Sequence, residues 1–83
     1  MVKITYTDSA LKQLRRIKLA DLKKVKRKIL SLSENPLLGK ALQGEFFGKK
    51  SLRAWPMRII YEFDHQNKII KVVDVDYRGD VYK

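Results

Sequence analysis

Arg53 and Arg58 stand on either side of an expected bend in the stretch 51–63, SLRAWPMRIIYEF. If AWPM forms a four-residue hairpin loop, the two arginines lie opposite each other on one face of a sheet. Like charges placed directly across a ladder destabilise it. Either nearby carboxylates neutralise the two guanidinium groups, or the pair holds a phosphate, which guanidinium groups bind through paired hydrogen bonds.

Further cations lie on both sides of this stretch. Lys49 and Lys50 form a doublet just upstream, and Arg78 follows in the closing sequence DYRGDVYK. Lysine pairs are often merely solvated, but on the sheet face that carries Arg53, Lys49 could contact a phosphate or a base. Alternation along the last strand predicts that Arg78 shares the face of Arg58.

The closing stretch also contains Tyr77 and Tyr82. Each could stack on a nucleic-acid base, a contact worth about 1–3 kcal/mol. The alternative for Tyr82 is packing as an anchor of the chain end.

Other kinds of site have little support in the sequence. His65 is the only histidine, it falls in a predicted hairpin loop, and cysteine is absent. Scattered carboxylates with one imidazole do not make a metal cluster. No glycine-rich phosphate loop and no serine with a nearby histidine partner is found. We therefore expect neither a metal nor a cofactor.

The charge balance points to an anionic partner. Nineteen Lys and Arg against nine Asp and Glu give a net charge of +10 over 83 residues. Such an excess in a small domain favours nucleic acid, a membrane surface or an acidic protein over a merely soluble basic surface. No apolar run approaches the roughly 20 residues needed to span a bilayer, and no secretory signal is recognised. With no cysteine, a cytoplasmic location is expected.

The pattern of elements predicts an α+β fold in a single domain, residues 1–83. Residues 2–7 alternate as a strand, Asp8 or Ser9 can cap a helix that starts there, and a second helix is expected from about Asp21 to Leu32. The two helices form a hairpin. Three strand-like runs follow, about 46–54, 57–63 and 68–77, whose short loops predict an antiparallel meander.

One face of this meander is expected to bury against the helical hairpin. Pairing of Phe63 with Ile69 would set Arg58 opposite Asp74. The predicted helix-facing residues are Leu52, Ala54, Met57, Ile59, Tyr61, Phe63, Ile69, Val73 and Val75. The predicted open face carries Lys49, Ser51, Arg53, Arg58, Glu62, Asp74, Asp76 and Arg78, with Ile60, Ile70 and Val72 among them.

Taken together, these motifs resemble the RelE/ParE superfamily of toxins from type II toxin–antitoxin systems, and the RelE-like branch in particular. The resemblance rests on NPLLGKALQG, on LR followed by RIIYE, and on the closing R..VY, and it covers nearly the whole chain. It implies a ribosome-dependent mRNA endonuclease, held in check by an acidic antitoxin protein, that cleaves without metal by attack of the 2′-hydroxyl on the adjacent phosphate.

The resemblance also implies roles for individual residues. Arg58 matches the arginine of the family's central strand, Arg78 and Tyr82 match the closing motif, and Lys49 matches one of two strand lysines. The second of those lysines falls on Ser51. These matches make Arg58, Arg78, Tyr82 and Lys49 the expected catalytic residues.

RNA contacts are expected from Lys50, Arg53 and Tyr77. Two alternatives remain open at this stage: a gyrase-poisoning toxin of the ParE type, and an inert basic module that binds only an antitoxin.

Overall fold

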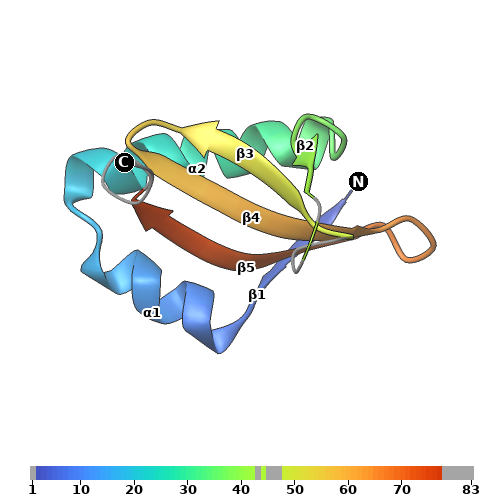
Figure 1. Ribbon diagram of the computed structural model, residues 1–83, viewed down its shortest axis with the longest axis horizontal. Coiled ribbons are helices and arrows are strands. Elements are labelled where there is room, and N and C mark those ends of the chain that lie inside the picture. The colour runs from blue at the N-terminus through green and yellow to red at the C-terminus, as the bar shows by residue number, and fades with distance from the viewer. Residues whose placement is uncertain (1, 43, 45–47, 78–83) are drawn as a thin grey trace.

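The computed structural model describes residues 2–42, 44 and 48–77 (Figure 1). Within these residues the elements are β1 Lys3–Tyr6, α1 Asp8–Arg16, α2 Leu19–Glu34, β2 Lys40–Ala41, β3 Lys50–Ala54, β4 Met57–Asp64 and β5 Ile69–Tyr77. The predicted α+β order of strand, helical hairpin and meander is confirmed.

The strands form one sheet in the order β1-β5-β4-β3-β2. The β3–β4–β5 meander is antiparallel, as the short loops predict, whereas β1 runs parallel to β5. β2 adds two residues to the far edge, where Lys40 pairs with Ser51 and Ala41 with Lys50. The sequence does not predict β2, because two residues are too few to show an alternation.

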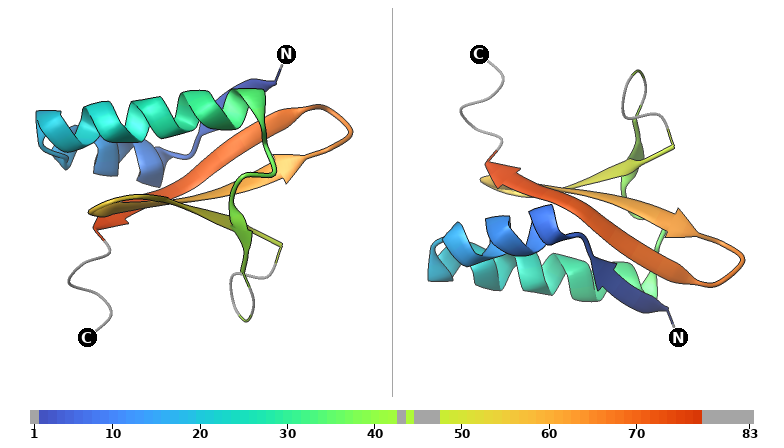
Figure 2. Two further views of the ribbon diagram at one scale, coloured as in Figure 1. Left: turned by 90° about the horizontal axis from the view of Figure 1, so that it is seen from above. Right: turned by 90° about the horizontal axis from the view of Figure 1, so that it is seen from below.

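Both helices lie on one face of the sheet, as expected (Figure 2). α2 packs against β3 and β4, and α1 packs against β5. The buried side chains of α2 are Val25, Ile29 and Leu32, whose helical spacing predicts this stripe.

The helices begin at other residues than the sequence predicts. Thr7, rather than Asp8 or Ser9, caps α1: its hydroxyl accepts the N–H of Ala10 at 3.1 Å. The same hydroxyl donates to the carbonyl of Val73 at 3.3 Å, which ties the start of the helix to β5. α2 starts at Leu19, two residues before the predicted Asp21, so only Ile17 and Lys18 join the helices.

A β-bulge in β5 corrects the predicted register. Ile60 is aligned with Asp74 but Tyr61 with Val72, so Val73 is the extra residue. The expected pairing of Phe63 with Ile69 is also wrong: β4 extends to Asp64, which pairs with Ile69, so Phe63 is aligned with Ile70.

The bulge also changes which residues of β5 face the helices. Ile70, Val72 and Val75 are all fully or almost fully buried in the core cluster. The predicted core positions of Ile69 and Val73 are wrong for the same reason, since one extra residue reverses the alternation beyond it. On β4, Ile60 points to the face opposite the helices, as predicted. It is nevertheless fully buried, so that face is not open to solvent at Ile60.

Tyr61 fixes the connection that leads from α2 to β2. Its side chain is fully buried, and its hydroxyl donates to the carbonyl of Pro36 at 2.8 Å while it accepts the N–H of Gly39 at 2.9 Å. Burial raises the pKa of Tyr61, and the hydrogen bond from Gly39 opposes this more weakly, so the neutral phenol is retained and can donate. A Cβ at Gly39 would lie 2.7 Å from that hydroxyl oxygen and 3.0 Å from the carbonyl oxygen of Ser51, so this close approach requires glycine.

The Tyr61→Phe variant should lose about 1–3 kcal/mol of unfolding free energy, because it leaves the part-buried N–H of Gly39 and carbonyl of Pro36 without their buried partner. Urea unfolding measures the loss. Tyr6→Phe is the matched control, since Tyr6 is 38% exposed and a change at such a site costs less than about 0.5 kcal/mol.

The difference in unfolding free energy between the Tyr61→Phe variant and the unchanged protein should also depend on pH. A raised pKa contributes stability that is present below the ordinary tyrosine value of 10.0 and is lost as the pH rises through the raised value. The stability gap should therefore narrow above pH 10.0. Equal losses in the Tyr61 and Tyr6 variants would contradict the anchoring role.

Candidate functional site

Arg53 and Arg58 are aligned with each other across β3 and β4, as the sequence predicts. The loop between these strands is shorter than expected, because Ala54 also pairs with Met57 and only Trp55 and Pro56 remain between them. Ala54 and Met57 are buried in the helix-facing core, so the neighbouring arginines lie on the other face.

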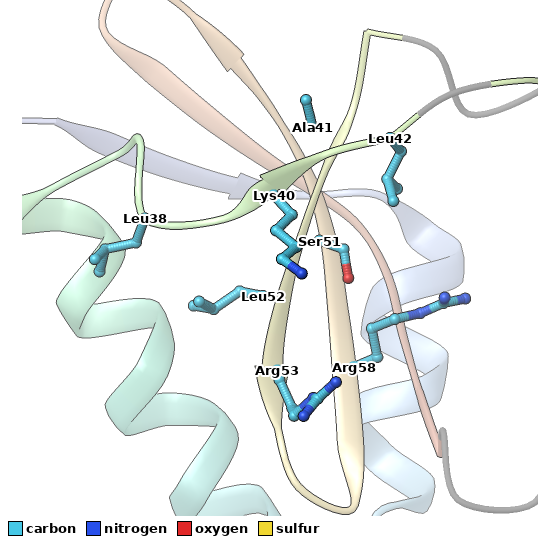
Figure 3. A pocket seen from close by; sticks show the side chains of 8 residues that line it. All are labelled: Leu38, Lys40, Ala41, Leu42, Ser51, Leu52, Arg53 and Arg58. Carbon is cyan, nitrogen blue, oxygen red and sulfur yellow. The ribbon is translucent and has the colours of Figure 1, made fainter.

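An open pocket of about 490 Å³ includes both arginines (Figure 3). The described residues that line it are Leu38, Lys40, Ala41, Leu42, Ser51, Leu52, Arg53 and Arg58. None of these is acidic, so the charged groups that the described residues supply to this pocket are all cations. Such an arrangement suits an anionic ligand.

Lys40 is the pocket residue that the sequence did not single out. It belongs to β2, and its side chain runs from that strand to end beside Ser51 (Figure 3). The signal available beforehand was only a lysine directly after Gly39 in an expected loop. Its position on the sheet depends on the hydrogen bonds of Tyr61, which no local pattern shows.

The carboxylates expected to neutralise the arginines are mostly engaged elsewhere. Glu62 forms an ion pair with Lys49 at 3.6 Å. Asp74 accepts a hydrogen bond from the side-chain amide of Gln13 at 2.6 Å. Arg58 is aligned with Asp76 and not with Asp74 as predicted, because the β4–β5 hairpin differs from the expected register by one residue at its turn and the bulge adds a second residue. Asp76 is thus the acidic residue aligned with the arginine pair.

Lys49 and Lys50 are placed differently by the structure. Lys49 directly precedes β3 and shares the face of Ser51 and Arg53, because alternate residues of a strand lie on the same face. It is four residues from Arg53, however, which is roughly 13 Å along the strand. Lys50 is aligned with the core residue Tyr61, which places it on the helix-facing side. The structure therefore does not bring Lys50 to the pocket.

Tyr77 also lies away from the arginine pair. It is aligned with Met57 and packs against the helix-facing core. Its hydroxyl donates to a carboxylate oxygen of Asp21 on α2 at 3.2 Å. The two remaining predicted site residues, Arg78 and Tyr82, lie outside the described residues.

The described residues contain neither a candidate metal site nor a membrane-spanning helix. No group of three or more His, Cys, Asp or Glu side chains lies there in a position to hold a metal ion. Neither described helix is long and apolar enough to cross a membrane.

Comparison with known proteins gives a consistent family. Residues 4–82 match the family described as ParE toxin of type II toxin–antitoxin system, parDE. Toxin RelG of Mycobacterium tuberculosis is 36% identical over 53 residues, which is 63% of this chain and 61% of that protein, so the match spans less than two thirds of the relative's length.

Solved structures extend the likeness to the whole fold. The RelBE2 toxin–antitoxin complex from Mycobacterium tuberculosis contains a chain with a TM-score of 0.86 and 28% identity, over 93% of this chain and 98% of that one. The intact E. coli RelBE toxin–antitoxin complex gives a TM-score of 0.80 at 20% identity, over 95% and 99% of the two chains, which is a likeness of fold. Since the family pattern spans almost the entire sequence, the chain belongs to the ParE toxin family of type II toxin–antitoxin systems, within the RelE/ParE superfamily.

Proposed function

We propose that this toxin inhibits translation by cleaving mRNA on the ribosome, and that the face carrying Arg53 and Arg58 receives the RNA backbone. The observation that carries the proposal is the arginine pair, aligned across β3 and β4 in a pocket whose described lining contains no acidic residue. Like-charged side chains aligned across a ladder repel each other, and a phosphate bound by their guanidinium groups relieves that repulsion. This function would take place in the cytoplasm, where ribosomes are found.

The proposed reaction breaks one phosphodiester bond. The 2′-oxygen of the ribose attacks the adjacent phosphorus as its proton passes to a base. The bond from phosphorus to the 5′-oxygen then breaks, and that oxygen takes a proton from an acid. The products are a cyclic phosphate and a free 5′-hydroxyl, and the balance requires no redox partner.

The proposed roles follow from where negative charge develops. Arg58 stabilises the charge that builds on the phosphate oxygens, and Arg78 is proposed to act with it. Tyr82 and Lys49 are the candidates for moving protons. A free phenol is a poor base near neutral pH, so Tyr82 needs neighbouring cations that lower its pKa.

Lys49 already forms an ion pair with a carboxylate, that of Glu62. Its ammonium lies 3.6 Å from Glu62, and the side chains are 28% and 41% exposed. An ion pair this exposed to water contributes little to stability. An RNA phosphate can therefore replace Glu62 beside Lys49 at a modest cost in free energy. Lys49 can in this way exchange Glu62 for an RNA phosphate, as its proposed role in moving a proton requires.

A second candidate function is gyrase poisoning, as in ParE-type toxins. The observation in its favour is the family match itself, together with Ser51 at a position where the resemblance implies a lysine. This activity needs a protein-binding surface and not an RNA-cleaving centre. It therefore predicts that loss of Arg58 leaves toxicity largely unchanged.

An acidic antitoxin segment is the proposed protein partner. The net charge is +10, and a groove of about 390 Å³ on the helical hairpin combines apolar and basic side chains. The residues that line it are Leu11, Leu14, Arg15, Ile17, Leu19, Leu22 and Lys26. Apolar anchors with a basic rim suit an amphipathic segment that carries Asp and Glu. The similar M. tuberculosis and E. coli structures are toxin–antitoxin complexes, which supports such a partner.

Arg58→Ala should lower the single-turnover rate of mRNA cleavage on programmed ribosomes by about 10²–10³-fold, the usual effect of removing one donor to a developing oxyanion. Lys24→Ala is the matched control, because it removes one positive charge from the exposed face of α2. Mapping of the mRNA 3′ ends detects cleavage. Intact mRNA with the unchanged protein, combined with inhibited gyrase supercoiling, would replace this function by the second candidate.

Binding to the antitoxin should be strong and sensitive to salt. Exposed opposite charges speed association, and their effect fades once ions screen them over about 10 Å at 0.1 M salt. Co-expression with the acidic protein encoded by an adjacent reading frame should co-purify both chains. Leu19→Asp, at a residue 68% exposed in the groove, should weaken the complex, whereas Leu30→Asp, 64% exposed and outside it, should not. No association at low salt would contradict this assignment.

A further inference from the structure

We propose that Lys40 is a third phosphate-contacting cation of the Arg53–Arg58 pocket, supplied by the short edge strand β2. This inference rests on the proposed function, since it names a further group that binds the RNA backbone. No sequence motif singles out Lys40, and the inference comes from its place in the sheet.

The register of β2 brings Lys40 within reach of the arginines. Lys40 is aligned with Ser51, and Arg53 is the next residue of β3 on the same face. Such diagonal neighbours lie about 7–8 Å apart, a gap that long side chains span. Because Ser51 has a short side chain, the lysine can lie over β3, where its ammonium ends beside Ser51 (Figure 3).

The backbone on both sides of Lys40 is held in place. Before it, the N–H of Gly39 donates to the hydroxyl of Tyr61 at 2.9 Å. After it, the N–H of Leu42 donates to the carbonyl of Lys49 at 2.9 Å. A strand of two residues would have little stability alone, so these bonds determine where Lys40 projects.

The surroundings of the ammonium favour an added anion. The described lining of the pocket offers the guanidinium groups of Arg53 and Arg58 and no carboxylate. A third cation on that face raises the electrostatic cost of leaving the pocket without an anion. The RNA backbone carries one negative charge per nucleotide. Neighbouring phosphates can therefore bind Lys40 and the arginine pair at the same time.

The salt dependence of RNA binding tests this inference without any cleavage. The probe is a short single-stranded oligouridylate whose 2′-hydroxyls are methylated, so that it cannot react. Each phosphate contact contributes about −0.7 to the slope of log K against log salt for a single strand. Lys40→Ala should therefore make the slope shallower by about 0.7, whereas Lys24→Ala should leave it unchanged.

Moving the lysine across one step of the ladder sharpens the test. The double variant Lys40→Ser with Ser51→Lys exchanges the two paired residues, so that β3 instead of β2 supplies the ammonium to the pocket. The salt slope should recover to the value of the unchanged protein, while Lys40→Ser alone stays shallow. Thermal unfolding of each variant shows whether the edge of the sheet is retained.

The outcomes separate this inference from the proposed function. A shallower slope for Lys40→Ala with no ribosomal cleavage by the unchanged protein would support the cation pocket and reject the endonuclease. Cleavage with equal slopes for Lys40→Ala and Lys24→Ala would support the endonuclease and overturn the role of Lys40. Absence of RNA binding by the unchanged protein at low salt would also overturn it.

Discussion

The buried hydroxyl of Tyr61 is the interaction on which the candidate site depends. It bonds to the carbonyl of Pro36 and the N–H of Gly39, and so joins the loop after α2 to the centre of the sheet. A strand of two residues is weakly held by its own pairing with β3, so these bonds, with that of Leu42 N–H to the carbonyl of Lys49, keep β2 in place. The same side chain thus belongs to the core on one side and positions Lys40 on the other.

Side chains alternate along β3 and β4, so the helix-facing side of the sheet and the opposite side differ in polarity. Apart from Lys50, the helix-facing side chains of these two strands belong to or pack against one hydrophobic cluster, and those on the opposite face include Ser51, Arg53 and Arg58. The bulge at Val73 lets Ile70, Val72 and Val75 all face the helices, and it places Asp76 rather than Val75 opposite Arg58. Gln13 then engages both Asp74 and the N–H of Val75, beyond the end of β1. Among the described acidic residues, Glu62 and Asp74 thus have other partners, and Asp76 is the one aligned with Arg58.

Local periodicity was enough to predict the two helices and the four longer strands, the helix-covered face of β3 and β4, and the pairing of Arg53 with Arg58. It failed where geometry depends on distant contacts. The run IIKVVDVDY is apolar at both alternations in its first half, so either register could be read from it, and only packing against the helices selects Ile70 and Val72. Thr7 was missed as a cap because Asp8 and Ser9 are equally good candidates by type. Lys40 was missed because its strand is defined by Tyr61 and β3, and not by its own sequence.

The central claim is that the sheet face opposite the helices, and not the basic helices, receives the RNA backbone. Its most direct test is an NMR titration of the arginine side-chain Nε–Hε signals with a 2′-O-methylated oligouridylate at low salt. Arg27, which is exposed on α2, provides an internal control of the same residue type. The account predicts saturable shifts at Arg53 and Arg58 and little change at Arg27. Shifts at Arg27 with unchanged signals from Arg53 and Arg58 would contradict it.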